Sequence, residues 1–319
     1  MMKVGYFADG PWSHKAIEII TDSVLFEVVF IVPRFDTQDP VLKKWAAKLE
    51  VPFLPSENVN SPEFIALIDG YKPDLLVSMS FNQILKKDII AYPPKGFINC
   101  HAGALPFYRG RNPLNWVLIN GENTFGITVH YVDEGIDTGD IIEQKHYPIS
   151  THDTYSSLLN IAVIECGEIL LSAMKKISED KVMRITQQDI HPVGTYFGMR
   201  TVGDENVDFN WPSVRIFNFI RAISSPGPGA RFWVERVEYA IEEAVLIPDA
   251  VTYIATVGEV IGRHVEGVVV KAGDSALLIK KIRRVGGTNE SKFFIPIFRL
   301  GTRLKSWPQA TYRVIDNEL

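Results

Sequence analysis

FEVVFIV, residues 26–32, is the stretch from which the fold can be inferred, because every residue in it except Glu27 is β-branched or aromatic. Strands that are buried on both faces of a parallel sheet have this composition. Similar short apolar runs lie at 2–8 (MKVGYFA), 74–80 (DLLVSMS) and 96–102 (GFINCHA), and helical patterns separate them. This alternation predicts an α/β fold built on an open, doubly wound, mostly parallel sheet.

The pattern changes after residue 122, and a second domain is predicted further along the chain. Two alternating runs at 125–132 and 140–149 are joined by a short loop, and 153–179 reads as one long amphipathic helix. The pattern weakens at 180–210, and residues 211–300 are rich in predicted strands separated by turn signals such as AGDS and VGGTN. We therefore expect an N-terminal domain at 1–205 and a smaller β-rich domain at 206–319.

Composition limits the classes of function. The net charge of −5 argues against binding to nucleic acid as the main activity, because such binding needs many phosphate contacts. Two cysteines are too few for a disulfide scaffold, and no Cys/His spacing indicates zinc. Neither a signal-peptide pattern nor an apolar run of about 20 residues is present, so we expect a cytoplasmic protein without a membrane span.

The segment FINCHAGALPFYRGRNPLNW (97–116) combines polar groups with chain-bending residues at the end of a predicted strand. Ligands bind beyond the carboxyl ends of strands in open α/β sheets. Side chains alternate along a strand, so Asn99 and His101 share one face and Cys100 faces away, which favours a packing role for the cysteine. Asn112 and Pro113 resemble a helix start, and Arg109 could help to bind an anion there, although ordinary surface charge explains the arginine equally well.

The second polar segment is VDEGIDTGD (132–140), an acidic loop after a predicted strand. It is either a solvated acidic hairpin or the source of an aspartate that orients His101 or a water. A metal site with His101 and His130 lacks any supporting spacing, and we expect none. The absence of a phosphate-binding GxxxxGK[ST] or a GxGxxG motif disfavours nucleotide hydrolysis and nicotinamide chemistry. The residues alone predict an Asn/His/Asp acid–base site that acts on a phosphate-bearing ligand.

Three segments together resemble the folate-dependent formyltransferase family: NCHAGALPFYRGRNPLNW, NGENTFGITVHYVDEGIDTGDII and residues 81–85. The resemblance implies a Rossmann-like catalytic domain, a barrel-like C-terminal domain, and N10-formyltetrahydrofolate as co-substrate without a metal. It places Asn99, His101 and Asp137 on the catalytic positions. In that mechanism the acceptor amine attacks the formyl carbon directly, His101 takes a proton, Asn99 stabilises the oxyanion, and Asp137 orients a water or the imidazole.

The segment GTYFGMRTVGDENVDFNWPSVRIFNFIRAISSPGPGA (194–230) resembles the nucleotide-sugar N-formyltransferases within that family. This implies a nucleotide-linked amino sugar as acceptor, such as a dTDP-3- or 4-amino-dideoxyhexose or a UDP-amino-pentose, for O-antigen or lipopolysaccharide biosynthesis. A homodimer is expected by the same resemblance. The expected folate-binding residues are Phe81, Asn82, Ile84, Leu85, Val132, Glu134 and Gly135. The expected acceptor-binding residues are Tyr108, Arg109, Asn112, Phe197, Arg200 and Arg221.

Three alternatives stay open at this stage. The first is methionyl-tRNA formyltransferase, which the basic runs at 280–284 (KKIRR) and 299–305 favour and the overall charge disfavours. The second is a non-catalytic folate- or nucleotide-sugar-binding module, against which the presence of Asn99, His101 and Asp137 argues. The third is release of the formyl group to water.

Overall fold

The computed structural model describes residues 1–286 and 292–307, and the chain forms two compact units. Unit 1 contains residues 1–114, 123–150 and 157–199, and unit 2 contains 115–122, 151–156 and the described residues from Arg200 onward. The chain therefore leaves unit 1 after Met199, and two short segments of unit 2 come from earlier in the chain. We keep 1–205 and 206–319 as the proposed domains.

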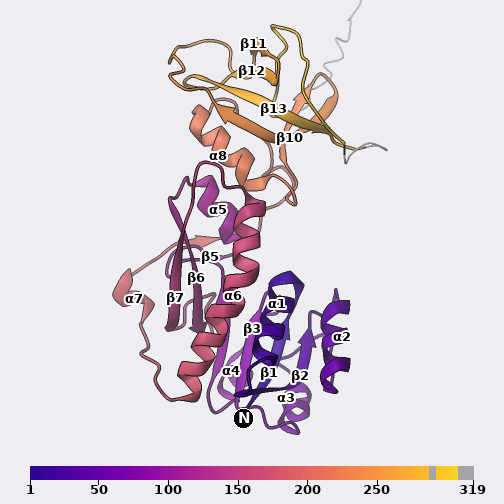
Figure 1. The fold of residues 1–319 in the computed structure, drawn as a ribbon, viewed down its shortest axis with the longest axis vertical. Coiled ribbons are helices and arrows are strands. Elements are labelled where there is room, and N and C mark those ends of the chain that lie inside the picture. Colours follow the sequence, from indigo (N-terminus) through magenta and orange to yellow (C-terminus); the bar gives the residue numbers. More distant parts are fainter. Residues whose placement is uncertain (287–291, 308–319) are drawn as a thin grey trace, which may run out of the picture. The chain divides into compact units, whose positions relative to one another are not determined.

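Unit 1 is built on one six-stranded sheet with the strand order β2-β1-β3-β4-β6-β7 (Figure 1). The first four strands in this order are parallel, β6 runs antiparallel to β4, and β7 runs antiparallel to β6. This confirms the predicted α/β class with a mostly parallel sheet. The strands are β1 (Met2–Ala8), β2 (Phe26–Pro33), β3 (Leu75–Met79), β4 (Phe97–His101), β6 (Thr124–Tyr131) and β7 (Ile141–Pro148).

Helices cover both faces of this sheet, as the near-continuous apolar strands require. The helices of the first half are α1 (Gly10–Thr21), α2 (Pro40–Leu49), α3 (Pro62–Asp69) and α4 (Lys87–Ala91). The next helix, α5 (Pro113–Ile119), falls mostly in unit 2. Tyr6 on β1 donates its hydroxyl to the Ser13 carbonyl of α1 at 2.8 Å, whereas the next residue, Phe7, packs edge-on against Phe64 of α3. The alternation along β1 thus sends neighbouring side chains into two separate helix layers.

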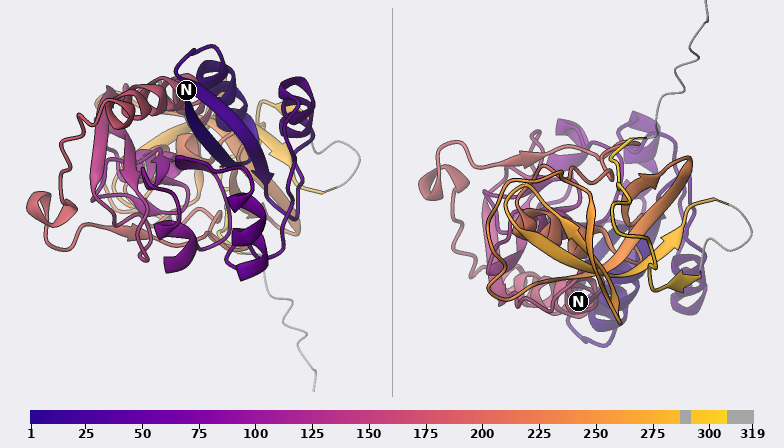
Figure 2. Two further views of the ribbon diagram at one scale, coloured as in Figure 1. Left: turned by 90° about the horizontal axis from the view of Figure 1, so that it is seen from below. Right: turned by 90° about the horizontal axis from the view of Figure 1, so that it is seen from above.

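The long helix α6 (Tyr155–Ser178) lies beside α1 (Figures 1 and 2). Gly167 allows this close approach, because a Cβ there would lie 3.2 Å from the Cα of Ala16. By length and composition α6 could cross a membrane, which the sequence analysis did not anticipate. Its residues Leu158, Ile169 and Met174 are buried in the protein, so in this structure α6 is a core helix.

The segment at 186–197, which we call the strap, belongs to unit 1 and is more structured than the weak sequence pattern indicated. It contains the short helix α7 (Gln187–Ile190) and the strand β8 (Tyr196–Phe197). Strand β8 pairs in parallel with β5 (Arg109–Gly110). The strap is therefore joined to the segment at 103–112 that follows β4, which we call the arm.

Unit 2 holds an antiparallel sheet with the strand order β11-β12-β13-β10-β9, and β14 also pairs with β13. This confirms the predicted β-rich C-terminal part. Residues 213–223, for which the sequence analysis named no element, form α8, whose buried Ile216, Ile220 and Ile223 have helical spacing. The elements are α8 (Ser213–Ile223), β9 (Ala230–Val234), β10 (Val237–Leu246), β11 (Val260–His264), β12 (Gly267–Lys271), β13 (Ala276–Arg284) and β14 (Phe293–Phe294).

Candidate active site

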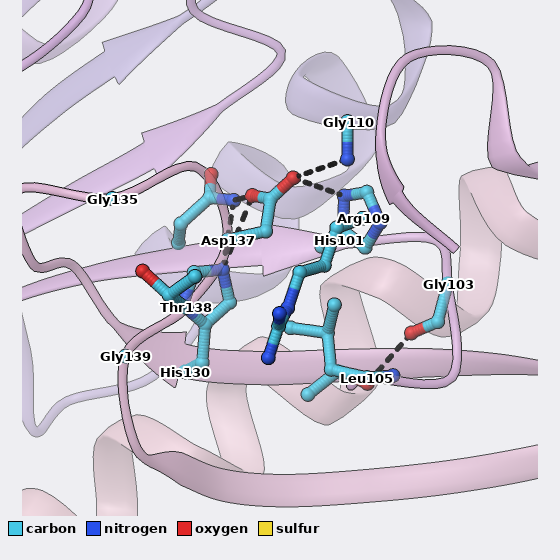
Figure 3. Close-up of polar contacts among 12 residues, drawn as sticks. His101, Gly103, Leu105, Arg109, Gly110, His130, Gly135, Asp137, Thr138 and Gly139 are labelled. Atoms are coloured by element: carbon cyan, nitrogen blue, oxygen red, sulfur yellow. Dashed lines mark hydrogen bonds and ion pairs between the residues drawn. The ribbon is translucent and has the colours of Figure 1, made fainter. Parts of the chain in front are cut away.

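Asp137 lies at the centre of a polar cluster at the carboxyl end of β4 (Figure 3). Its Oδ2 accepts a hydrogen bond from the Gly110 N–H at 2.9 Å and lies 3.6 Å from Nδ1 of His101. Its Oδ1 lies 3.5 Å from Nε2 of His130 and 3.4 Å from Nδ2 of Asn99. The structure therefore brings together the three residues predicted to be catalytic, and it adds His130 to them.

The two central strands explain this convergence. Asn99 and His101 are two residues apart on β4, so both side chains project from the same face. The antiparallel register of β4 with β6 places Asn99 opposite His130. Cys100 faces the other way, and its Sγ donates to the Cys166 carbonyl of α6 at 3.6 Å. The cysteine is thus buried against a helix, away from the cluster, as the alternation predicted.

One ring nitrogen of each histidine is hydrogen-bonded to a backbone carbonyl, and the other ring nitrogen faces the cluster. Nε2 of His101 lies 2.7 Å from the carbonyl oxygen of Tyr108, and Nδ1 of His130 lies 2.8 Å from that of Tyr131. A carbonyl oxygen only accepts, so these nitrogens carry the hydrogen. In the neutral rings, Nδ1 of His101 and Nε2 of His130 then hold the free lone pairs. Nε2 of His130 accepts from the Asn99 amide at 3.2 Å.

The Asp137 carboxylate is mostly buried, and its surroundings favour the ionised form. Burial pushes its pKa upward, but the charges of His101 and His130 and the hydrogen bond from Gly110 outweigh burial. The pKa of this carboxyl is therefore held well below its ordinary value. An ionised carboxylate at this place stabilises a positive charge on either imidazole.

The backbone of Asp137 has a φ of 54°, which is a left-handed conformation that a residue with a Cβ seldom adopts. Tyr108 and Asn112 of the arm and Ser80 after β3 share it, with φ values of 59°, 54° and 55°. Such residues persist where the surroundings hold them, and they concentrate at functional sites. The turn at Asp137 is therefore held by contacts outside its own loop.

One of these contacts comes from Gln187 on the strap, a residue that the sequence analysis did not single out. Its Nε2 donates to the carbonyls of Asp137 and Gly139, both at 2.8 Å, and its Oε1 accepts from the guanidinium of Arg109. Arg109 also donates to the Val193 carbonyl. The arginine predicted to meet the acceptor is thus engaged within the protein, and its binding role stays a prediction.

The other residues predicted to bind the acceptor are placed as follows. The ring of Tyr108 stacks on that of Phe197, with centroids 5.2 Å apart and an interplanar angle of 9°, and Asn112 is exposed at the end of the arm.

Arg200 and Arg221 belong to unit 2. There the half-buried Arg200 lies near Asp204 and Glu205, and the buried Arg221 donates to Asn218 and to the Asp153 carbonyl.

The residues predicted to bind the folate lie on two segments of unit 1. Phe81 packs edge-on against Phe7 and Leu85 is buried, whereas Ile84 is 70% exposed and its carbonyl accepts from Asn60. Asn82 donates to Asp36, Val132 donates its N–H to the Phe97 carbonyl, Glu134 is exposed, and Gly135 donates its N–H to Asp133. Their roles in binding the folate stay predictions.

His130 is the site residue that the sequence reasoning missed, having considered it only for a metal. The signal that could have revealed it is register, because the run GITVHYV alternates in a strand next to β4. Within 1–286 and 292–307 no group of three or more His, Cys, Asp or Glu side chains is arranged to hold a metal ion. The cluster therefore offers acid–base chemistry with a carboxylate, two imidazoles and an amide.

Comparison with known proteins identifies the family. The model of the formyl transferase family matches residues 10–174, and that of the formyl transferase C-terminal domain matches residues 201–291. The chain belongs to the formyl transferase family. The prediction that this protein is an enzyme of the formyltransferase class is thereby confirmed, as is the two-part fold expected for it.

Individual relatives carry different names. The chain is 32% identical to a methionyl-tRNA formyltransferase of Halothermothrix orenii, over 83% of each protein. It is 36% identical over 189 residues to the bifunctional polymyxin resistance protein ArnA of Wigglesworthia glossinidia brevipalpis, which covers 59% of this chain and 29% of that protein. Sequence comparison therefore establishes the formyltransferase family and leaves the acceptor undecided.

Solved structures share the fold over nearly the whole chain. WlaRD, a sugar 3N-formyl transferase solved with dTDP and 5-N-formyl-THF, has a TM-score of 0.66 at 20% identity and covers 90% of this chain and 99% of its own. An N-formyltransferase from Helicobacter canadensis, solved with folinic acid and dTDP-3-aminofucose, has a TM-score of 0.67 at 19% identity, covering 88% and 100%. At these identities the likeness concerns the fold alone.

Proposed function

We propose that this protein transfers the formyl group of N10-formyltetrahydrofolate to the amine of a nucleotide-linked amino sugar, with a dTDP-3- or 4-amino-dideoxyhexose as the expected acceptor. The amine attacks the formyl carbon, and the C–N10 bond then breaks. The products are an N-formyl sugar and tetrahydrofolate, whose N10 has taken up a proton. No acyl-enzyme forms, in keeping with the position of Cys100 behind the sheet.

The free lone pair on Nδ1 of His101 supplies the base for this reaction. The attacking amine loses a proton as it becomes an amide, and His101 accepts it. The new N–H then faces the Asp137 carboxylate, which is 3.6 Å away and stabilises the imidazolium. A positioned base of this kind contributes about 10²–10⁴ in rate.

Asn99 supplies the group for the developing oxyanion. Its Nδ2 makes two long contacts, 3.2 Å to His130 and 3.4 Å to Asp137. A formyl oxygen that gains negative charge in the tetrahedral intermediate would be the stronger acceptor for one of these hydrogens. Loss of one oxyanion donor costs about 2.7–4 kcal/mol in other enzymes.

Folate as the formyl donor is supported by the solved neighbours that hold 5-N-formyl-THF or folinic acid. In our proposal the pterin lies between residues 81–85 and the loop 132–137, and it is recognised mainly by main-chain groups. Phe81, Leu85 and Val132 contribute to the apolar wall, and Asn82, Ile84, Glu134 and Gly135 border it. No metal ion is needed, because His101 and Asn99 handle the proton and the charge.

The observation that favours a sugar over a tRNA is that Lys280 and Lys281 on β13 are paired with glutamates. Lys281 lies 3.0 Å from Glu243, and Lys280 lies 3.3 Å from Glu243 and 3.1 Å from Glu266. Arg283 of the same run donates to the Pro228 carbonyl. Cations that are paired with the protein's own carboxylates contribute little to the binding of a phosphate backbone. Binding to tRNA depends on many contacts between cations and phosphates.

Methionyl-tRNA formyltransferase is the second candidate. It is favoured by the 32% identity to the relative of that name, which extends over 83% of both chains. The residues of the acid–base cluster serve either acceptor, since both present a primary amine. The two candidate functions therefore differ in which acceptor the protein binds.

The test is a panel of acceptors mixed with purified protein and N10-formyltetrahydrofolate. It contains dTDP-3-amino- and dTDP-4-amino-6-deoxyhexoses, UDP-4-amino-arabinose and methionyl-tRNA, and the His101→Asn variant is the matched control. We expect tetrahydrofolate release together with a gain of one formyl mass on a single nucleotide sugar. Formylation of the tRNA alone would establish the second candidate, and tetrahydrofolate release without any formylated amine would indicate a hydrolase.

The cellular setting follows from this acceptor. We propose a cytoplasmic enzyme that provides N-formyl sugars for O-antigen or lipopolysaccharide synthesis, and we propose that it works as a homodimer. Light scattering of the purified protein checks the oligomeric state, and a mass of about 36 kDa would contradict the dimer.

A further inference from the structure

Gln187 is a buried neutral side chain that uses its full hydrogen-bonding capacity to connect the strap with two other segments. It is 1% exposed, although it lies in a helix of only four residues. Its Oε1 accepts from Nε and Nη2 of Arg109 at 3.0 and 2.7 Å. Its Nε2 donates to the carbonyls of Asp137 and Gly139. Two lone pairs and two hydrogens are thus all engaged.

These hydrogen bonds link the arm to both the side chain and the main chain of Asp137. Arg109 and Gly110 are neighbours on the arm, and each reaches Asp137 by a different route. Gly110 binds Oδ2 of the carboxylate directly at 2.9 Å, whereas Arg109 reaches the backbone carbonyl of Asp137 through Gln187. The side chain and the main chain of Asp137 are therefore both held from the arm. This accounts for its left-handed φ of 54°, which its own loop would not favour.

We propose that Gln187 is a positioning residue that fixes the Asp137 turn to the arm, so that the carboxylate faces His101 and His130 before the substrates bind. The proposal builds on the formyl-transfer mechanism above and adds a residue that touches neither substrate. It makes the acid–base cluster dependent on an amide 50 residues away in the sequence. The side chain supplies hydrogen bonds of both senses, which a charged residue of the same size does not.

Two substitutions separate this role from simple packing. Gln187→Met keeps the length and apolar bulk but leaves Arg109 and two carbonyls without their partner. Gln187→Glu keeps the acceptor for Arg109 but turns a carboxylate oxygen toward the carbonyls of Asp137 and Gly139, which cannot donate. Gln188, the next residue, is exposed and provides the matched controls Gln188→Met and Gln188→Glu.

The first readout is titration of the Asp137 carboxyl by ¹³C NMR in the ligand-free protein, assigned with Asp137→Asn. The titratable side chains that contact this carboxylate are His101 on β4 and His130 on β6, and the arm adds the Gly110 N–H. If the carboxylate leaves these partners, its pKa rises toward the ordinary value. We expect that rise in both Gln187 variants and in neither control.

The second readout is kinetic. A catalytic group that moves by about 1 Å loses on the order of 10² in rate, so we expect kcat to fall by about 10- to 100-fold in both Gln187 variants. The KM for the formyl donor should change by less than kcat. Thermal unfolding confirms that each variant is folded at the assay temperature, and if Gln187→Met does not fold, Gln187→Glu provides the test.

An unchanged titration of Asp137 together with kcat within about twofold of wild type in a folded Gln187 variant would overturn the proposal. So would an equal effect of the same substitution at Gln188. The titration needs no acceptor, so it tests the position of the carboxylate even if the wild-type protein formylates none of the amino sugars. Failure to formylate any amino sugar would count against the proposed function and not against the positioning role of Gln187.

Discussion

His101 and His130 face opposite oxygens of one carboxylate, from two strands that run in opposite directions. Nδ1 of His101 lies 3.6 Å from Oδ2 of Asp137, and Nε2 of His130 lies 3.5 Å from Oδ1. Only one of the two, His101, is expected to take the proton of the amine. The second imidazole accepts a hydrogen bond from the Asn99 amide, so the two histidines have separate and testable expected roles.

Replacement of the proposed base should remove most of the activity without unfolding the protein. For His101→Asn and for Asp137→Asn we expect kcat to fall by about 10²–10⁴. Single-turnover formation of the formylated sugar, measured by mass spectrometry, checks this, and circular dichroism verifies the fold. Turnover near the wild-type level in either variant would refute these roles.

Replacement of His130 should have a smaller effect on rate. His130→Phe removes the acceptor for the Asn99 amide and the polar neighbour of Oδ1 of Asp137, so we expect kcat to fall by about tenfold or more through misplacement of both groups. His146 on β7 is exposed, and His146→Phe is the matched control. Loss of activity equal to that of His101→Asn would instead make His130 the base.

The depressed pKa of Asp137 predicts how stability depends on pH. A carboxyl with a folded-state pKa below its unfolded value of about 3.9 stabilises the fold above that pH. The contribution is lost as the pH falls through the folded-state pKa. We expect the difference in unfolding free energy between wild type and Asp137→Asn to be largest near neutral pH and to shrink below a pH of about 4. Urea denaturation in neutral and acidic buffers measures it, and a difference that grows in acid would contradict the assignment.

Cys100 should be dispensable for the reaction. It is buried on the far side of β4, where its Sγ contacts the Cys166 carbonyl. We expect Cys100→Ala to retain activity within about twofold and to lower the free energy of unfolding by about 1 kcal/mol, because it leaves a small void. Complete loss of activity in a folded Cys100→Ala variant would restore the cysteine as a candidate nucleophile.

The two acceptors can be distinguished on β13. Lys280 and Lys281 are paired with Glu243, so we expect the double variant Lys280→Ala/Lys281→Ala to formylate the nucleotide sugar within about twofold of wild type. If tRNA were the acceptor, removal of two phosphate contacts would weaken its binding and reduce the slope of log K against log salt by about 1–2. Fluorescence titration with methionyl-tRNA at several salt concentrations measures that slope.

The parallel sheet and the face shared by Asn99 and His101 were predictable, because both follow from local patterns. An unbroken apolar run indicates a strand buried on both faces, and a spacing of two fixes the side of the sheet. His130 and Gln187 were not singled out, since their roles depend on strand register and on a contact across 50 residues. Helix α8 was not recognised, because its aromatic and β-branched residues favour strands, whereas packing selects the helix.

The predicted binding residues show a second limit of sequence reasoning. The sequence identifies a guanidinium at Arg109 and does not reveal what that group binds. In the structure its donors are directed at Gln187 and Val193, which no spacing rule relates to residue 109. Patterns therefore place side chains on strands and faces better than they identify the partners of those side chains, which depend on how distant loops pack.

The strap holds the arm largely through main-chain groups, and this affects how such an enzyme can diversify. Arg109 and Arg111 donate their N–H groups to the carbonyls of Thr195 and Phe197, whereas Val193, Tyr196 and Met199 nearby expose most of their side chains. Mutations at those exposed positions leave the arm in place. Related enzymes can therefore differ at these exposed positions while the acid–base cluster is inherited unchanged.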